Sequence, residues 1–248
     1  MYHHVCPPDL VPAGQVPLEG WQYNIAPELF RNQLQVMQRR GWRFVSLADY
    51  TAGLLDGTTQ RRQLAAITFD DGWRDNWDFA VPVLADLKLP ATIFVVSSAI
   101  SGVRADRRMT DTQLRQLAGY QIAVGAHSRT HPRLTALNAS DLQTEVQGSR
   151  HELQDVTGTD VPFFAYPGGR FNRSVVAAVQ AAGYTAACSV IGLARNDHNS
   201  LFWLYRDVFS DHCSSWRDRL RMSAAFRTCV GWRAARRVQQ ALDANGTR

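Results

Sequence analysis

Two short groups of polar residues could together bind a metal ion. The first is Asp70 and Asp71, which follow the apolar run Ala66–Phe69. The second is the pair His127 and His131, four residues apart and also preceded by an apolar run. Zinc at a catalytic centre takes three nitrogen or oxygen ligands and keeps one position open, so one carboxylate and two imidazoles satisfy it. The second carboxylate is then free to act on a water molecule.

Each group also has an ordinary structural interpretation. An acidic pair before a glycine is commonly a solvated turn, and two histidines at this spacing occur by chance. The pair does not match the metalloprotease pattern, because Ser128 stands where His-Glu-x-x-His has its glutamate. Both groups nevertheless follow a predicted strand, and in α/β barrels the chemistry gathers at the C-terminal ends of strands. We therefore expect them to lie on one rim.

The rest of the chain alternates helical and strand patterns that could position these groups. Apolar residues recur at helical spacing in several segments, and polar residues mark where those helices begin. Continuous apolar runs between them are typical of parallel strands buried on both faces. This alternation predicts an α/β fold with a parallel sheet. The expected helices are residues 27–40, two that begin with capping boxes at Thr110 and Ser140, and one from Asn172 to about Gly183; the expected strands include residues 91–96 and 184–189.

Length and charge predict one domain with a basic end. A chain of 248 residues with 45% hydrophobic content can bury one large core, so a single domain over residues 1–248 is expected. From Arg217 onward there are eight arginines and two aspartates, although the whole chain carries only +5. We expect an amphipathic helical segment at about 214–248 that covers the core, with contact to a membrane surface, an anionic polymer or a protein as the alternatives. No nucleic-acid-binding motif accompanies this charge, so nucleic acid is not an expected partner.

The cysteines and the N-terminus indicate the expected compartment. The four cysteines lack the spacing of metal fingers and are expected to be reduced structural thiols. Cys188 lies in a buried-strand pattern and Cys213 in a loop-like one. No secretory signal peptide pattern and no apolar run of membrane-spanning length is found. The sequence as written is therefore expected to be cytoplasmic.

The motifs resemble those of the polysaccharide deacetylases, also called carbohydrate esterase family four or the NodB-homology domain. Thr68–Gly72 resembles the first motif of that family, and His127–His131 resembles the second. Phe164–Gly169 resembles the third motif in the variant found in exopolysaccharide deacetylases, and Met1–Val5 resembles the first strand of that group. The resemblance covers roughly residues 1–190. It implies an α/β fold of the distorted (β/α)7 TIM-like barrel type, with the active site at the C-terminal ends of the strands.

The resemblance implies a metal-dependent enzyme that removes N-acetyl groups from amino sugars of a polysaccharide, oligosaccharide or lipid-linked glycan and releases acetate. Carried over by motif, Asp71, His127 and His131 hold one divalent ion, zinc first, with cobalt, nickel or manganese as alternatives. Asp70 is then the general base. The backbone N–H of Gly168 is the expected donor to the oxyanion.

Two positions depart from the family pattern. Ala165 stands where many members carry an arginine that orients the base, so Arg170 and Arg206 become candidates for that contact. The late leucine-x-histidine motif, whose histidine protonates the leaving amine, is not found. His3 is the expected substitute for that acid, in preference to His212, which is expected to be a surface loop residue.

Aromatic residues beside the motifs predict a saccharide substrate, because ring faces stack on the apolar faces of sugars. Trp73 and Tyr166 are expected to contact it, whereas Trp77 is expected to pack in the following helix. Two other functions fit the same residues. One is hydrolysis of an O-acetyl ester or a non-sugar amide, and the other is a non-catalytic saccharide-binding protein that keeps the fold.

Overall fold

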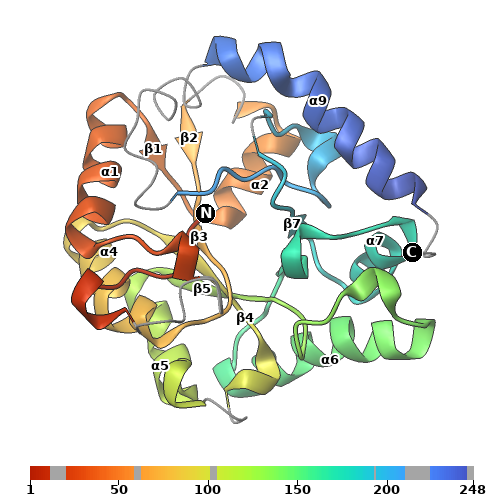
Figure 1. Cartoon of the computed structure of the whole chain (residues 1–248), viewed down its shortest axis with the longest axis horizontal. Coiled ribbons are helices and arrows are strands. Elements are labelled where there is room, and N and C mark those ends of the chain that lie inside the picture. Colours follow the sequence, from red (N-terminus) through yellow and green to blue (C-terminus); the bar gives the residue numbers. More distant parts are fainter. Residues whose placement is uncertain (12–20, 59–62, 101–104, 193, 210–223, 245–248) are drawn as a thin grey trace.

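The computed structural model describes residues 1–11, 21–58, 63–100, 105–192, 194–209 and 224–244. Short strands lie in the middle of the molecule, and the helices surround them (Figure 1). The strands in these residues are β1 (Arg43–Phe44), β2 (Leu64–Ala65), β3 (Ile67–Phe69), β4 (Ala91–Val95), β5 (Ile122–Ala126), β6 (Phe163–Ala165) and β7 (Ala186–Cys188).

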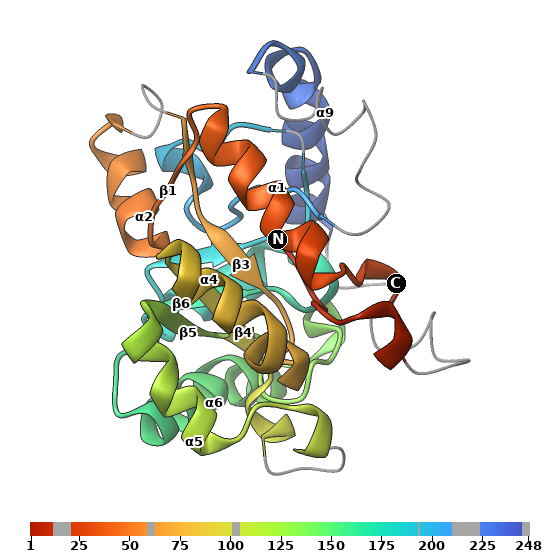
Figure 2. The ribbon, with the colours of Figure 1, turned by 90° about the vertical axis from the view of Figure 1, so that its left-hand side faces the viewer.

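The helices form an outer layer that follows the strands around the molecule. On one flank, α1, α4 and α5 succeed one another, with α6 beyond them (Figure 2). A π-helical turn, Asn76–Ala80, leads directly into α4. The α-helices are α1 (Pro27–Arg39), α2 (Leu47–Leu55), α4 (Val81–Leu87), α5 (Asp111–Gln116), α6 (Ala139–Thr157), α7 (Arg173–Ala181) and α9 (Ala224–Asp243).

The sheet is parallel and its strands are ordered as in the sequence. Strands β3, β4, β5, β6 and β7 are hydrogen-bonded in that order, and β1 pairs in parallel with β2. Every residue of β3, β4, β6 and β7 is buried, as expected for parallel strands covered on both faces. The predicted α/β class and parallel sheet are confirmed.

Two extended segments join the edges of this curled sheet. Residues 1–5 run beside the free edge of β3, with backbone hydrogen bonds of 2.8 and 3.1 Å. Residues 201–209 run beside β7, again through backbone hydrogen bonds. The amide of Phe209 donates to the carbonyl of Met1 at 3.0 Å and so connects the two segments. The two segments therefore connect the two edges of the sheet, while a complete (β/α)7 barrel stays a prediction.

Two of the three predicted helix caps are confirmed. Thr110 forms a capping box at the start of α5, and the Asn172 side chain accepts from the backbone of α7. The prediction for Ser140 was wrong, because the side chain of Asn138 accepts from the Asp141 amide and α6 already begins at residue 139. The asparagine offers a good cap two residues earlier, so the helix starts there.

Helix α9 packs against α7 at the C-terminal end of the described chain. Ala234 and Val238 face inward, whereas Arg233, Arg236 and Arg237 are exposed. Among the described residues, no helix combines the length and apolar character needed to cross a membrane. The expectations for His212, for Cys213 and for residues 214–223 of the basic segment lie outside the described residues.

Candidate active site

The three predicted metal ligands converge at the ends of β3 and β5. One ligand atom each from Asp71, His127 and His131 lies within 4.8 Å of the others. The Oδ1 atom of Asp71 is 3.6 Å from Nε2 of His127 and 3.7 Å from Nε2 of His131. Only β4 separates the two strands in the sheet, so the turns that follow them open on the same rim, as the sequence predicted.

His127 is held in a form that can ligate a metal. It is buried, and its Nδ1 lies 2.8 Å from the carbonyl oxygen of Ala165, which can only accept. Nδ1 therefore carries the proton and Nε2 keeps a free lone pair that faces Asp71. Burial lowers the pKa of His127 against the opposing effect of nearby Asp70 and Asp71, which favours the neutral imidazole.

The turn that carries His131 has an uncommon backbone conformation, and hydrogen bonds hold it in place. Ser128 and His131 both adopt the left-handed region, with φ of 60° and 61°, which non-glycine residues occupy only when their surroundings fix them. The Ser128 hydroxyl accepts from the His131 amide at 3.0 Å. Glu145 of α6 accepts from the amides of Arg129 and Thr130 at 2.9 and 2.8 Å. These bonds hold the exposed His131 ring beside Asp71.

The donor set fits a divalent metal ion. Zinc binds nitrogen and oxygen ligands at about 2.0–2.2 Å, so two ligands on one ion can be as much as about 4 Å apart. The two oxygen-to-nitrogen separations at Asp71 fall in that range and are too long for hydrogen bonds. One carboxylate with two imidazoles leaves open positions on the ion, which is typical of catalytic zinc rather than structural zinc.

Asp70 is buried beside this cluster and is held by Arg206. The guanidinium donates to both carboxylate oxygens, at 2.6 and 2.8 Å, and Nε donates to the Ser189 carbonyl at 2.8 Å. Burial, the largest single effect, would raise the pKa of Asp70, but the charge and hydrogen bonds of Arg206 act together with His127 and His3 and lower the pKa well below its ordinary value. Of the two arginines that the sequence offered for this contact, the structure selects Arg206, whereas Arg170 is exposed.

His3 lies at the same edge, on the segment beside β3. Its ring stacks on Tyr23, with centroids 4.9 Å apart. Burial lowers the pKa of His3, and the negative charges of Asp70 and Asp71 act in the opposite direction. Its Nδ1 atom is buried and has no hydrogen-bond partner among the described residues. The His3 imidazole is therefore neutral, and it lies close enough to Asp70 and Asp71 for their charges to act on it.

The third motif, Phe164–Gly169, lies beside the site, with its tyrosine ring buried and Gly168 exposed. Tyr166 is completely buried, and its hydroxyl donates to the Phe202 carbonyl at 2.8 Å. The expected contact between this side chain and a substrate is therefore corrected, because the ring belongs to the core. Gly168 is exposed and has a φ of 60°, and its motif is tied to the site through the bond from His127 to Ala165.

Trp73 lies beside the site but is buried rather than open to solvent. Only 3% of its surface is exposed, and its indole N–H donates to Oδ2 of Asp71 at 3.1 Å. The structure thus gives it a contact with a predicted metal ligand, and its expected contact with a sugar stays a prediction. Trp77 packs edge-on against Tyr120, as expected.

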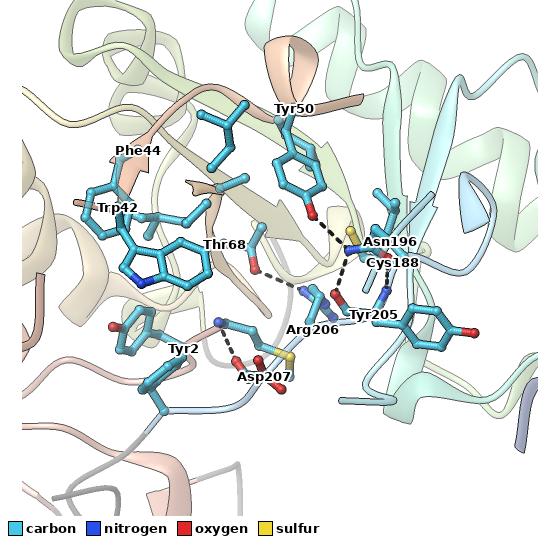
Figure 3. Close-up of a pocket in the computed structure, with 18 of the residues that line it drawn as sticks. Tyr2, Trp42, Phe44, Tyr50, Thr68, Cys188, Asn196, Tyr205, Arg206 and Asp207 are labelled. Carbon is cyan, nitrogen blue, oxygen red and sulfur yellow. Dashed lines mark hydrogen bonds between the residues drawn. The ribbon is translucent and has the colours of Figure 1, made fainter. Parts of the chain in front are cut away.

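A separate cavity of about 120 Å³ lies behind Arg206. Figure 3 shows aromatic side chains such as Trp42 and Phe44 on one side of it, and Arg206 with Thr68 on another. Asp71, His127 and His131 do not line it. The cavity is therefore distinct from the metal cluster, and Arg206 borders both the cavity and the site.

Sequence reasoning did not identify several residues that shape the site. Glu145 could have been noticed, because it interrupts the apolar face of α6 that Leu142, Val146 and Leu153 form. Arg108 donates to the backbone carbonyl of Asp71, and the Asp75 carboxylate lies 2.6 Å from Nδ1 of His4. No spacing rule links either residue to the predicted ligands, so these contacts are visible only in three dimensions.

Comparisons with known proteins agree with this geometry. The family model for polysaccharide deacetylases matches residues 57–187. The chain is 24% identical over 187 residues to YxkH of Bacillus subtilis (strain 168), whose name refers to polysaccharide deacetylation; the match covers 75% of this chain and 66% of YxkH. It is 28% identical over 109 residues to a bifunctional xylanase/deacetylase of Pseudobutyrivibrio xylanivorans, covering 44% of this chain and 17% of that protein. The chain thus spans less than two thirds of either relative.

Solved structures share the fold. The Streptococcus pyogenes deacetylase PplD, solved in complex with acetate, superposes with a TM-score of 0.77 at 22% identity, over 90% of this chain and 95% of that one. IcaB from Ammonifex degensii gives a TM-score of 0.71 at 19% identity, over 90% and 95%. A de-N-acetylase from Aggregatibacter actinomycetemcomitans gives 0.73 at 16% identity, over 90% and 97%. At these identities the likeness establishes the fold.

Proposed function

The chain belongs to the polysaccharide deacetylase family, and on that premise we propose that it hydrolyses N-acetyl groups of amino sugars in a polysaccharide, oligosaccharide or lipid-linked glycan and releases acetate. The observation that carries this proposal is the convergence of Asp71, His127 and His131 beside Asp70, a buried carboxylate held by Arg206. A metal site next to an ionised base supplies what amide hydrolysis requires at neutral pH.

Asp71, His127 and His131 would hold one divalent ion, with zinc the first expectation and cobalt, nickel or manganese as alternatives. When bound, such an ion polarises the acetyl carbonyl and lowers the pKa of a water molecule. The neutral form of His127, fixed by the Ala165 carbonyl, supports this role because a protonated imidazole cannot ligate.

Asp70 would act as the general base that takes a proton from the attacking water. The Arg206 guanidinium helps to keep it ionised and fixes its orientation, so little reorganisation is needed during reaction. A carboxylate with a lowered pKa is a weak base in bulk water. Its effect here depends on position, since it lies directly beside the predicted metal ligands.

Gly168 and His3 would complete the reaction. The backbone N–H of Gly168, exposed in the turn after β6, is the proposed donor to the oxyanion of the tetrahedral intermediate. His3 is the proposed acid that protonates the leaving amine. Because burial lowers its pKa, His3 is neutral before the reaction and would first have to gain a proton. That proton would be the one that Asp70 removes from water.

We also propose that residues 1–248 form one domain built as a distorted (β/α)7 barrel of the exopolysaccharide-deacetylase variant. The hydrogen bonds that connect residues 1–5 and 201–209 to the two edges of the sheet support this arrangement. The exposed arginines of α9 would be the surface for a membrane or protein contact, as their charge suggests.

Acetate release from three classes of substrate tests the proposed activity. Zinc-loaded protein would be incubated with N-acetylglucosamine oligomers, with O-acetylated xylan and with a simple aliphatic acetamide. We expect acetate mainly from the N-acetylated sugars. Faster release from the xylan would reassign the protein as an ester hydrolase. Binding of the oligomers without any acetate would favour a saccharide-binding protein.

A further inference from the structure

The two oxygens of the Asp71 carboxylate have different partners. Oδ1 faces both histidines, at 3.6 Å from His127 and 3.7 Å from His131. Oδ2 points away from them and accepts a hydrogen bond of 3.1 Å from the indole N–H of Trp73. One oxygen is thus directed at the metal position, while the other is already engaged by a donor that the protein supplies.

The Trp73 ring is itself fixed on both faces. The Arg108 guanidinium carbon lies 3.4 Å from the ring centroid, and an isolated backbone bridge joins the two residues. On the other side the His4 ring lies 4.4 Å away, tilted by 33°. Arg108 also donates to the backbone carbonyl of Asp71 at 2.5 Å, at a residue whose φ is 76°. The side chain and the backbone of Asp71 are therefore both held.

His4 is anchored in turn and so gives the indole a rigid support. It is completely buried, stacks on Trp21 with centroids 3.8 Å apart, and its Nδ1 lies 2.6 Å from Oδ2 of Asp75. The other oxygen of Asp75 accepts from the amide of Val5 at 2.9 Å. The indole stack, defined as Arg108, Trp73, His4 and Trp21, therefore connects the N-terminal segment to the turn after β3.

We propose that Trp73 is a positioning residue for the metal ligand Asp71. Its N–H engages Oδ2 and thereby limits the carboxylate to binding the ion through Oδ1 alone. This inference rests on the proposed function, because it concerns the metal site of that reaction. Donors in the second coordination shell orient a ligating carboxylate, and their loss typically weakens metal binding by about 10- to 100-fold.

A packing role alone does not account for the contact. An indole that only filled the core would not need its single donor directed at the one carboxylate shared by both histidines. Phenylalanine can keep the ring between Arg108 and His4 while removing the N–H. The substitution Trp73→Phe therefore separates positioning from packing. Trp77→Phe is the matched control, because Trp77 is four residues away and packs edge-on against Tyr120.

The test measures metal binding directly on the full chain. Zinc affinity would be determined by competition with a chromophoric chelator for the wild type, Trp73→Phe and Trp77→Phe. The visible spectrum of bound Co²⁺ would report the coordination number, and the melting temperature of the metal-free forms would report packing. For Trp73→Phe we expect the zinc affinity to fall by about tenfold or more. We also expect a weaker Co²⁺ absorption, which would indicate added carboxylate coordination. Trp77→Phe should keep the wild-type values.

The outcomes distinguish this inference from the function on which it rests. If the wild type binds zinc and Trp73→Phe binds it equally well with an unchanged Co²⁺ spectrum, the positioning role is wrong while the metal site stands. A lower melting temperature with unchanged affinity in the folded protein would likewise assign Trp73 to packing. If the wild type itself binds no zinc or Co²⁺, the metal site fails and the positioning role fails with it.

Discussion

Arg206 and Asp70 form a buried two-point ion pair between residues 136 positions apart in the sequence. The guanidinium nitrogens lie 2.6 and 2.8 Å from the two carboxylate oxygens, and both side chains are almost completely enclosed. The pair joins the end of β3 to the segment beside β7. It thus links the proposed base to the region where the two edges of the sheet meet.

Replacing Arg206 should destabilise the fold strongly. In Arg206→Met the Asp70 carboxylate stays buried without its counter-charge, which costs about 3–5 kcal/mol of unfolding free energy. Because Arg206 holds the pKa of Asp70 low, its contribution to stability is present above the ordinary carboxyl pKa and is lost as the pH falls. Urea titrations at pH 7 and pH 2 would show a large loss for the variant at pH 7 and a smaller one at pH 2, which lies well below the ordinary carboxyl pKa of 3.8.

The exposed pair of Arg31 and Asp86 supplies the control for this measurement. Both of its side chains are open to solvent, so Arg31→Met should change the unfolding free energy by about 1 kcal/mol or less. Equal losses in the two variants would contradict a special role for the buried pair.

Removing the charge of Glu145 should loosen the turn that carries His131. Glu145→Gln weakens the bonds to the amides of Arg129 and Thr130, at a cost of about 1–3 kcal/mol. Faster hydrogen exchange at those two amides and weaker zinc binding are expected. Asp155→Asn, an exposed substitution on the same helix, should change neither quantity. Unchanged exchange in Glu145→Gln would show that the turn holds its shape without this carboxylate.

The sequence predicted the features that depend on residues close together in the chain. The aspartate pair and the two histidines were expected on one rim because both groups follow the end of a strand, and parallel strands place such turns together. The choice of Asp71 rather than Asp70 as a metal ligand came from the resemblance to the family. Helix caps at Thr110 and Asn172 followed from the pattern of a few neighbouring residues. Rules that use only neighbouring residues were therefore sufficient for the strand-end turns and for these helix caps.

Contacts between distant segments could not be predicted in the same way. The sequence offered Arg170 and Arg206 equally as partners of Asp70, since nothing local indicates which arginine reaches the end of β3. Tyr166 was expected at the substrate because it lies in a motif, although its side chain points into the core. Side-chain direction at the end of a strand depends on what packs around it, which sequence spacing does not specify.

Gly169 should resist substitution more than its neighbour Gly168. Both glycines have positive φ, which costs an alanine about 1 kcal/mol. At Gly169 an added methyl would also come within 2.1 Å of the Val190 side chain, whereas nothing lies near Gly168. Gly169→Ala should therefore lower the melting temperature more than Gly168→Ala. Gly119→Ala, which has open space and no positive φ, should be neutral or stabilising. A similar change in all three variants would contradict the predicted clash.

The buried thiols should be unreactive in the folded protein. Burial raises the pKa of Cys188 to about 11 and that of Cys6 to about 12, from an ordinary value of 9.0. At pH 8 iodoacetamide should leave both unmodified until the chain is denatured, as peptide mass mapping would show. The folded state keeps these protons above pH 9 and the unfolded state releases them, so stability should fall as the pH rises from 9 to 11. Rapid alkylation of native Cys188 would contradict its enclosure.

The most direct test of the central claim is acetate release from N-acetylglucosamine oligomers by Asp70→Asn beside the wild type, with bound zinc measured on both. The substitution keeps the size of the side chain and leaves Asp71, His127 and His131 in place, but it removes the proposed base. We predict that both proteins bind one equivalent of zinc and that acetate release falls by about 100-fold or more in the variant. Equal release by the two zinc-loaded proteins would contradict the assignment of Asp70, and absence of zinc from the wild type would contradict the metal site itself.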